Sequence, residues 1–478
     1  MTRRRNLLVL VALAAAVAAL LAAVLGGGDG GHTDPLAFEA DRKADFERRA
    51  AAGLSHVLYA KSPGGAAASA RRTAAWRSQV ETAAQAARLD PDLLEAIVLL
   101  ESAGRPDVIA GDDPEAASGL TQILAETGQN LLGLRVDLAA SRSLTKRIAA
   151  AERRERDAAA ARLRARRRRV DERFDPAKAL AATGRYLTIA RRRFGRDDLA
   201  VASYHMGIGN LERALRAYAG DGDAAIDRVV GEGDLSYARL FFDSTPLLHE
   251  EAHAVLSSFG DDSSTYLWRV LAAREIMRLH RENPAELGRL EGLHARKASA
   301  EEVLHPSTST EVFGSPADLR AARADGDLVE LPDDPGRYHF AVDRQMGELA
   351  ARVGETPDLY RALRPEALAL LAYMAAGVEE VSGLGPLVVT STVRDPSYQR
   401  VLGRRNREAA RDYSLHTTGY SFDVLREYRS REQALAFEFW LGRLQALDLI
   451  AWVREPRAIH VTVSSEAERL SALLPGGG

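Results

Sequence analysis

The sequence predicts a multidomain chain with an N-terminal transmembrane helix, an all-α domain and a C-terminal α+β domain. Its 478 residues exceed the size of one ordinary domain. Apolar residues recur at helical spacing through most of residues 71–306, with glycine and proline at the expected helix ends. After residue 338, short apolar strands alternate with helices, which is the pattern of an α+β fold.

Composition limits the chemistry available to the chain. Hydrophobic residues make up 46% and charged residues 27%, so the chain can form a packed, soluble body. The net charge of −3 gives no reason to expect a nucleic-acid partner, and we expect none. Because the chain has no cysteine, it has no disulfide, thiolate zinc site or cysteine nucleophile. Any metal must therefore be bound by histidines and carboxylates.

Residues 1–25 are predicted to be a membrane anchor or a signal segment. Three arginines, residues 3–5, precede an uncharged run from Leu7 to Leu25 that is about long enough to cross a bilayer. The basic flank should stay in the cytoplasm, so the body is expected outside it. A cleaved signal peptide is the alternative, although its apolar region would be shorter. We expect a single-pass cell-membrane protein with its body in the cell envelope, or a secreted protein if this segment is cleaved.

The rest of the chain divides by composition. We expect a linker with a short helix (26–70, helix 36–54), a helical domain (71–306), a second linker (307–337) and an α+β domain (338–474). Within the helical domain, residues 142–174 form a highly charged insertion with almost no apolar stripe. That composition favours a solvated, protruding helix, although a basic run could also contact anionic wall polymers.

One predicted helix ends its apolar face with a carboxylate. The stretch DLLEAIVLLESAGRP runs from Asp92 to Pro106 and places Glu101 on the same face as Ile97 and Val98. Asp90 is the expected N-cap, and Ala103-Gly104 the expected end. Burial and the negative helix end both raise a carboxyl pKa. An acid that keeps its proton near neutral pH suits general-acid cleavage of a glycosidic bond. The alternative is a structural acid paired with a buried arginine.

Four stretches, in order, resemble the soluble lytic transglycosylases of the goose-lysozyme-like superfamily. They are LLES (99–102), ASGLTQIL (117–124), DPAKALAATGRYL (175–187) and AVASYHMGIGNLERAL (200–215). Each stretch alone is a modest signal, but four in the family's order make a specific one. The resemblance covers about residues 75–215 and implies an all-α lysozyme-like domain that acts on peptidoglycan.

The resemblance also implies roles for individual residues. Glu101 would protonate the leaving oxygen and then act as a base, with Ser102 beside it, while Gln122 and Tyr204 would orient the sugar. The substrate's own N-acetyl group or C6 hydroxyl would be the nucleophile, which gives an anhydro-muramic end without a cofactor. Two positions depart from the family pattern: Thr121 replaces methionine and His205 replaces asparagine.

A second set of residues lies in the C-terminal part. In SLHTTGYSFDV (414–424), a turn at Gly419 would let His416 and Asp423 face one point, and His460 on another strand could join them. Two histidines and one carboxylate with an open position make a catalytic zinc site.

These stretches resemble the zinc D-Ala-D-Ala carboxypeptidase and hedgehog-like peptidase group. The resemblance implies zinc bound by His416, Asp423 and His460, Arg394 as a substrate-binding residue and Gln399 as a support. The family's general-base glutamate, three residues before the last histidine, is replaced by Arg457. The nearest acid is Glu455, which an alternating strand would place on the opposite face unless a bulge at Pro456 intervenes. A degenerate fold kept for wall binding is the alternative.

The stretch HEEAH (249–253) fits the zinc-metallopeptidase pattern of two histidines one helical turn apart. It lies in the helical region, and neither His280 nor His294 has a known spacing for a third ligand. We therefore interpret it as a solvated helix face. The sequence as a whole predicts a peptidoglycan-cleaving lyase with a C-terminal domain that binds zinc and trims or recognises stem peptides. The alternatives are a non-enzymatic wall-binding scaffold and an all-peptidase protein that uses HEEAH.

Overall fold

The computed structural model describes residues 34–232, 234–296, 299–404, 413–467 and 470. They form two compact units, one from Phe38 to Gly292 and a second that contains the described residues from Leu293 onward together with residues 34–37. The predicted organisation, a helix-rich part followed by an α+β part, is confirmed. Among the described residues, no helix has the length and apolarity that a membrane span requires. The predicted anchor, residues 1–25, lies outside them.

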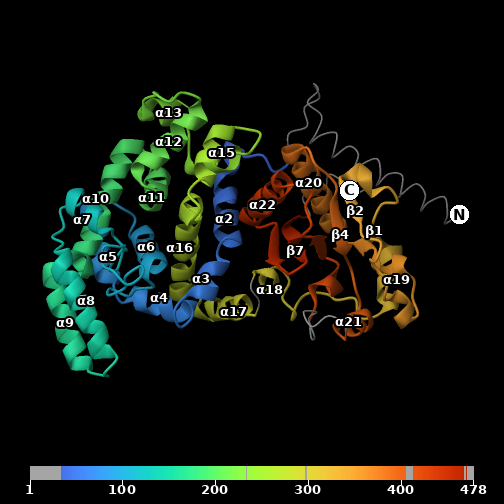
Figure 1. Cartoon of the computed structure of the whole chain (residues 1–478), viewed down its shortest axis with the longest axis horizontal. Helices are drawn as coiled ribbons and strands as arrows, with labels where there is room; N and C mark the ends of the chain where they lie inside the picture. Colours follow the sequence, from blue (N-terminus) through green and yellow to red (C-terminus); the bar gives the residue numbers. More distant parts are fainter. Residues whose placement is uncertain (1–33, 233, 297–298, 405–412, 468–469, 471–478) are drawn as a thin grey trace. The chain divides into compact units, whose positions relative to one another are not determined.

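The first unit is built from helices around α16 (Tyr266–Glu282), which packs against α2, α4, α6 and α11 (Figure 1). Trp268 of α16 is fully buried. The helices before α16 are α2 (Lys43–Gly53), α3 (His56–Lys61), α4 (Ala66–Ala74), α5 (Arg77–Ala87), α6 (Pro91–Ser102), α7 (Ala125–Asn130), α8 (Leu138–Glu152), α9 (Asp157–Val170), α10 (Pro176–Phe194), α11 (Asp197–Met206), α12 (Ile208–Ala219), α13 (Ile226–Glu232), α14 (Tyr237–Asp243) and α15 (Glu250–Ser257). Helix α17 (Pro284–His294) follows α16.

Within the predicted segment 26–70, the flexible linker expected around residues 64–70 is helical instead. The structure has helix α4 where the Gly/Ala/Ser composition indicated a flexible segment, and Ala66, Ser69 and Ala70 of this helix are buried. Small side chains allow close helix contact as readily as they allow flexibility, and here they let α4 pack against α6 and α16. The predicted short helix at 36–54 is present as α2, which begins later, at Lys43.

The charged insertion forms a hairpin of α8 and α9, which pack against each other and project from the helical unit (Figure 1). Its apolar contacts come from Leu144, Ile148 and Ala160, which are all buried. One of its arginines, Arg167, is 2% exposed. The Arg167 guanidinium lies 3.7 Å from the ring centroid of Phe174 and pairs with Asp107 at 3.0 Å. The prediction of a single solvated helix therefore misses the second helix and its buried arginine.

The second unit is built on a five-stranded sheet. Strand order is β2 (Phe340–Val342), β4 (Leu387–Ser391), β5 (Ser421–Leu425), β7 (Ala458–Val463) and β6 (Ile450–Arg454), with only β2 and β4 parallel. Helices α20 (Pro365–Ser382) and α22 (Arg431–Ala446) pack together and contact β7 and β6, respectively. The sequence predicts strands at 387–393, 419–425 and 458–463, which are β4, β5 and β7, and helices at 364–381 and 431–447, which are α20 and α22. Strands β2 and β6 are additional.

Residue alternation gives the central strands β5 and β7 two different faces. Phe422 pairs with Val461 and Val424 with Ile459, and these four side chains are buried in the apolar core. On the opposite face Asp423 pairs with His460 and Ser421 with Thr462. Successive strand residues point to opposite faces, so this register brings the polar residues of both strands to one side of the sheet. The predicted metal ligands lie on that side.

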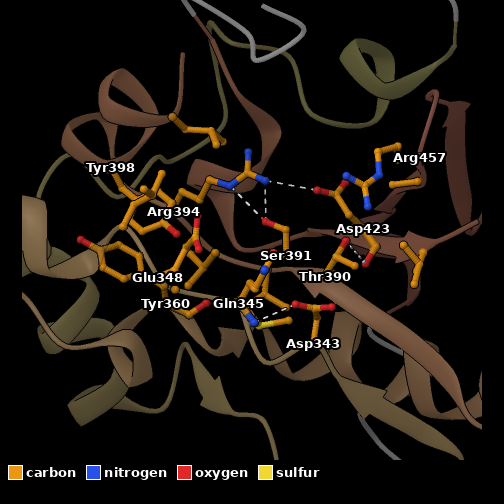
Figure 2. A pocket seen from close by; sticks show the side chains of 18 of the residues that line it. Asp343, Gln345, Glu348, Tyr360, Thr390, Ser391, Arg394, Tyr398, Asp423 and Arg457 are labelled. Carbon is orange, nitrogen blue, oxygen red and sulfur yellow. Dashed lines mark hydrogen bonds and ion pairs between the residues drawn. The ribbon is translucent and has the colours of Figure 1, made fainter. Parts of the chain in front are cut away.

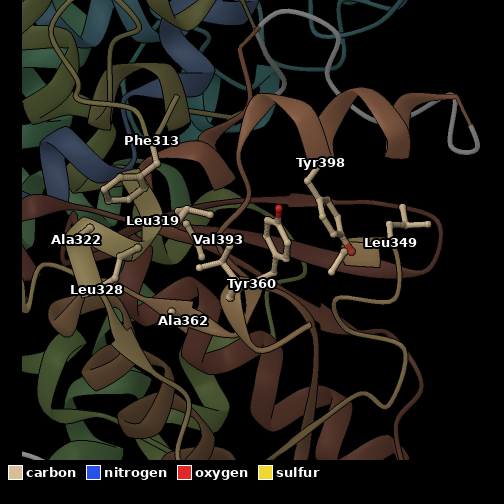
Figure 3. Packing of buried hydrophobic residues seen from close by; sticks show 11 residues of the cluster. Phe313, Leu319, Ala322, Leu328, Leu349, Tyr360, Ala362, Val393 and Tyr398 are labelled. Carbon is tan, nitrogen blue, oxygen red and sulfur yellow. The ribbon is translucent and has the colours of Figure 1, made fainter. Parts of the chain in front are cut away.

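The predicted linker over residues 307–337 is instead part of the second unit. Phe313, Leu319, Ala322 and Leu328 are buried in a cluster with Tyr360, Val393 and others (Figure 3). The segment contributes α19 (Pro316–Asp325) and β1 (Val329–Glu330), which pairs with β3 (Ala362–Leu363). Before this segment, the second unit contains the short helix α18 (Glu301–Leu304), which contacts β6 and β7. Helix α21 (Pro396–Gly403) follows β4.

Candidate functional sites

Helix α6 places Glu101 in its last turn, as the sequence predicts. The Asp90 side chain accepts a hydrogen bond from the Asp92 backbone N–H at 2.9 Å, and Pro91 is the first helical residue. The helix ends at Ser102, where Ala103 has a φ of 52° and Gly104 a φ of 73°. A Cβ on Gly104 would lie 2.6 Å from the Arg72 backbone, so α4 can pack against this turn only with a glycine there.

Helix α6 carries two glutamates whose surroundings differ. Glu95 is 1% exposed and pairs with Arg77 at 2.9 Å and with Arg281 of α16. Glu101 accepts a hydrogen bond from the Tyr266 hydroxyl at 2.6 Å. Among the described residues no cation pairs with Glu101, whereas Glu95 is the buried acid that arginines pair with, although these arginines are themselves partly exposed.

Burial raises the pKa of Glu101 to about 7, although the hydrogen bond from Tyr266 acts in the opposite direction. A buried carboxyl group loses the hydration that would stabilise its charge. Glu101 therefore retains its proton at pH values where ordinary glutamates are ionised, as a general acid requires.

Tyr204 joins the third and fourth predicted stretches to Glu101. Its hydroxyl donates to the backbone oxygen of Thr121 at 2.8 Å and lies 3.2 Å from Thr183 Oγ1. Its ring stacks on Tyr266 with centroids 6.1 Å apart. A contact chain thus runs from the Thr121 loop through Tyr204 and Tyr266 to Glu101. Sequence reasoning misses Tyr266 because it begins α16, outside the four stretches.

The other predicted residues have different environments. Gln122 has a φ of 50°, and its amide donates to the backbone oxygens of Gly119 at 2.9 Å and Val108 at 3.2 Å, so this group closes its own loop. Ser102 is buried and donates to the Val98 oxygen of its own helix at 3.1 Å, so its hydroxyl faces the interior. Contact between Gln122 and the sugar stays a prediction. The buried position of Ser102 gives no support for a contact between Ser102 and the sugar.

His205, at the position where the family pattern has asparagine, is exposed beside this site. Its ring stacks on Tyr266 with centroids 5.3 Å apart, and its Nδ1 lies 2.9 Å from Ser263 Oγ. His205 therefore adds an imidazole to the stacked rings of Tyr204 and Tyr266 next to Glu101.

Residues 155–226 match the family model of the transglycosylase SLT domain. The matched segment contains Tyr204 and His205 and ends before α16. It begins after Glu101, Ser102 and Gln122, so their assignment rests on the resemblance of short stretches and on the contacts above. No curated protein matches the chain.

The structure brings His416, Asp423 and His460 together in the second unit. His416 lies in a 3-10 turn (Leu415–Thr418), and the other two face each other on β5 and β7. One ligand atom from each residue lies within 4.8 Å of the others. His416 Nε2 is 3.3 Å from Asp423 Oδ2, and His460 Nδ1 is 2.8 Å from Asp423 Oδ1.

The remaining imidazole nitrogens have partners that fix the orientation of both rings. His416 Nδ1 lies 2.8 Å from the backbone oxygen of Thr392, and His460 Nε2 lies 2.7 Å from Glu301 Oε1. These partners leave His416 Nε2, His460 Nδ1 and the Asp423 carboxylate directed at one another. Two imidazole nitrogens and one carboxylate are a suitable donor set for Zn²⁺, so the residues present fit this ion.

The protonation states of this cluster follow from burial and from neighbouring charges. Burial and the positive charge of Arg394 lower the pKa of His416 to about 4, so it is neutral, as a metal ligand must be. Burial would lower the pKa of His460, but its bonds to Asp423 and Glu301 outweigh this effect and raise it to about 10. Without a metal His460 therefore carries a second proton, which zinc binding at Nδ1 would have to displace. The two histidines hold the pKa of Asp423 well below its usual range despite its burial.

A cavity of about 490 Å³ opens beside Asp423 and is also lined by Arg394, Glu348, Glu455 and Arg457 (Figure 2). Arg394 reaches Asp423 Oδ2 at 3.2 Å and Gln399 Oε1 at 3.2 Å. Gln399 thus contacts Arg394, and its role as a support stays a prediction.

Glu455 is not on an alternating strand. It follows the last residue of β6, and its backbone N–H donates to Ala458 at 2.9 Å across the turn to β7. The turn therefore brings Glu455 and Arg457 to the cavity that Asp423 lines, without the strand bulge that the sequence suggested.

The two histidines of the HEEAH stretch have separate environments. His249 precedes α15 with a φ of 50° and stacks on Tyr218 with centroids 3.8 Å apart. His253 lies within α15, where its Nε2 is 3.2 Å from Ser257 Oγ. Since His249 is outside the helix, the two histidines do not share a helix face. Within the described ranges, His416, Asp423 and His460 form the only group of three or more histidines and acids whose ligand atoms lie close enough together to hold a metal ion.

Proposed function

We propose that this protein is a peptidoglycan lytic transglycosylase with Glu101 as its acid and base. The observation that carries this proposal is the contact chain from Tyr204, within the matched SLT segment, through Tyr266 to a protonated Glu101. The SLT match supports peptidoglycan as the substrate and lyase chemistry as the reaction. The environment of Glu101 supplies the acid that this reaction requires.

The proposed reaction needs one carboxyl group. Glu101 donates its proton to the bridging oxygen at a muramic acid residue while the bond from C1 to that oxygen breaks. The resulting Glu101 carboxylate then removes the proton of the muramic C6 hydroxyl, whose oxygen bonds to C1. The products are a free hydroxyl on one fragment and a 1,6-anhydro-muramic end on the other. Glu101 regains its proton, and no water is consumed.

The first test compares two glutamates of α6. Glu101→Gln should abolish release of anhydro-muropeptides from purified peptidoglycan, because an amide cannot donate this proton. Glu95→Gln changes the other buried acid of the helix and should lower thermal stability while the folded protein continues to release product. Unchanged release by Glu101→Gln would contradict the lyase proposal and favour a non-enzymatic wall-binding scaffold.

We also propose that the second unit binds zinc and acts on or recognises stem peptides. Its support is the convergence of His416, Asp423 and His460 beside a cavity that contains Arg394 and Glu455. Bound zinc would supply Lewis acidity toward a peptide carbonyl. Arg394 would contact a substrate carboxylate, and Glu455 is the candidate base within this cavity.

Metal analysis tests this second function. His416→Ala should lose bound zinc, whereas His249→Ala, which changes the discounted HEEAH stretch, should retain it. Digestion of peptidoglycan with and without a chelator then separates the two activities, because only peptide cleavage should require the metal. Zinc retained by His416→Ala but lost from His249→Ala would favour the HEEAH alternative.

The proposed substrate also bears on location. A peptidoglycan-cleaving body must act outside the cytoplasm, in agreement with the orientation that residues 1–25 predict. We therefore propose a cell-envelope protein held at the cytoplasmic membrane by this segment, or a secreted protein if the segment is removed. Fractionation of cells, with detection of the chain in membrane and medium, distinguishes the two forms.

A further inference from the structure

Glu301 approaches the proposed metal site from a part of the chain that the sequence does not connect with it. It lies in α18, which precedes the predicted linker 307–337 in the sequence. It is therefore outside residues 338–474, the part of the sequence expected to form the peptidase-like domain. The structure places α18 against β6 and β7 within the second unit. A residue from outside the expected domain thus reaches its metal-binding face.

The contacts of Glu301 are short and buried. The residue is 1% exposed, and its Oε1 lies 2.7 Å from His460 Nε2. The same oxygen accepts a hydrogen bond from Thr462 Oγ1 at 3.0 Å, and Thr462 in turn lies 2.8 Å from Ser421 Oγ. A series of polar side chains along one face of β5 and β7 therefore holds the Glu301 carboxylate in place.

We propose that Glu301 is a positioning residue for the metal: it binds Nε2 of His460 and thereby directs Nδ1 at the ion. This inference rests on the proposed zinc site. A carboxylate on the far nitrogen of a histidine ligand fixes the ring and its tautomer and makes the coordinating nitrogen more basic. The backbone oxygen of Thr392 serves His416 in the same way, so the non-coordinating nitrogen of each histidine is held by an oxygen. At His460 the Thr462 hydroxyl lies 3.3 Å from the same nitrogen, beside the closer Glu301 carboxylate.

The two supports differ in a way that makes Glu301 testable. The support of His416 is a neutral carbonyl that no side-chain substitution removes. The support of His460 is a charged side chain, which Glu301→Gln replaces by a neutral group of the same size. Removal of such a partner weakens metal binding by about 10- to 100-fold in other proteins. We expect a loss in this range for Glu301→Gln.

The experiment measures Zn²⁺ affinity of the full chain by competition with a chromophoric chelator. Glu301→Gln should bind zinc about 10- to 100-fold more weakly than the wild type, whereas Glu301→Asp, which keeps the charge, should recover part of the affinity. Glu302→Gln is the control, because Glu302 is the next residue of α18 and its carboxylate lies 3.9 Å from Arg296. The control should keep wild-type affinity. Substitution with Co²⁺ should give an altered visible spectrum for Glu301→Gln alone.

The outcomes separate this inference from the proposed function. Failure of the wild-type chain to bind zinc would overturn both. Wild-type binding together with unchanged affinity and an unchanged Co²⁺ spectrum for Glu301→Gln would overturn the role of Glu301 alone. If Glu301→Gln does not fold, Thr462→Val takes its place, because it removes the hydroxyl that donates to Glu301 and lies 3.3 Å from His460 Nε2. Thr462→Val should then weaken zinc binding severalfold, and wild-type affinity for it would overturn the inference.

Discussion

At the scale of single residues, the environment of a carboxylate decides its role. Glu95 and Glu101 lie on one helix, and both approach α16. Glu95 meets Arg281 near one end of α16, and Glu101 meets Tyr266 at the other, so the two helices run antiparallel. Glu95 pairs with two arginines, whereas burial raises the pKa of Glu101 beside Tyr266. Glu101 is therefore the residue of α6 that can donate a proton for chemistry.

The pKa of Glu101 predicts how glycan cleavage depends on pH. Because the proton-bearing form is the active acid, kcat/KM should fall as pH rises through about 7, where this carboxyl ionises. The raised pKa also implies that Glu101 contributes to the free energy of unfolding. This contribution is complete at pH values below the pKa of the glutamate in the unfolded chain, and it is lost as pH rises through about 7. A pH profile of product release on purified peptidoglycan measures the first effect. Full activity maintained to pH 9 would contradict the assignment.

Tyr266→Phe should move this alkaline limit to higher pH. The substitution keeps the aromatic ring but removes the hydroxyl, whose hydrogen bond lowers the pKa of Glu101. A hydrogen bond to a charged group has a net value of a few kcal/mol at most, so we expect a shift of about one pH unit. Tyr186→Phe is the matched control, because the Tyr186 hydroxyl bonds Ser203 at 2.6 Å instead. A downward shift, or equal shifts for both variants, would exclude the proposed role of the hydroxyl.

The sequence predicts the residues of each site better than their partners. Glu101, His416, Asp423 and His460 belong to short stretches whose residue types and spacing indicate chemistry. Tyr266 and Glu301 come from distant helices, and only the fold brings them to Glu101 and His460. A tyrosine at the start of a helix or an acid in a short turn has no distinguishing pattern in one sequence.

At the scale of elements, local signals predict α6 well. Its start depends on Asp90 and Pro91 and its end on Gly104, all within a few residues of the helix. The two predicted linkers are wrong for the opposite reason. Residues 64–70 and 307–337 contain turn-forming and small residues, but tertiary contacts that the local composition does not reveal make them helices and core. Strand β6 is missed for the same reason, since it completes the sheet by pairing with β7.

Leu319→Ala tests whether residues 307–337 are part of the second unit. Leu319 is fully buried in the cluster of Figure 3, and removing such a side chain costs about 2–5 kcal/mol of stability. Val312, in the same segment, is 42% exposed, so Val312→Ala should change stability by less than about 0.5 kcal/mol. Calorimetry of the full chain measures both. Equal, small effects would restore the linker interpretation.

At the scale of the whole molecule, the chain has two units with separate chemistry. The helical unit contains the proposed acid Glu101, and the unit from Leu293 onward contains the proposed metal ligands. No residue of the contact chain around Glu101 is a ligand of the proposed zinc site. Covalent linkage keeps both units near the same polymer, which raises the effective concentration of the second after the first has bound.

This separation predicts that metal removal affects one unit only. Zinc at 100 times its dissociation constant stabilises a folded unit by about 2.7 kcal/mol, and a chelator removes that contribution. In calorimetry of the full chain, a chelator should therefore lower the unfolding transition of the second unit and leave the other transition in place. Release of anhydro-muropeptides should continue at the same rate, since Glu101 requires no metal. In His416→Ala the chelator should shift neither transition, because the site is already empty. Loss of glycan cleavage on chelation would show that the activity of the first unit requires the metal. The proposal that the two units have separate activities would then be wrong.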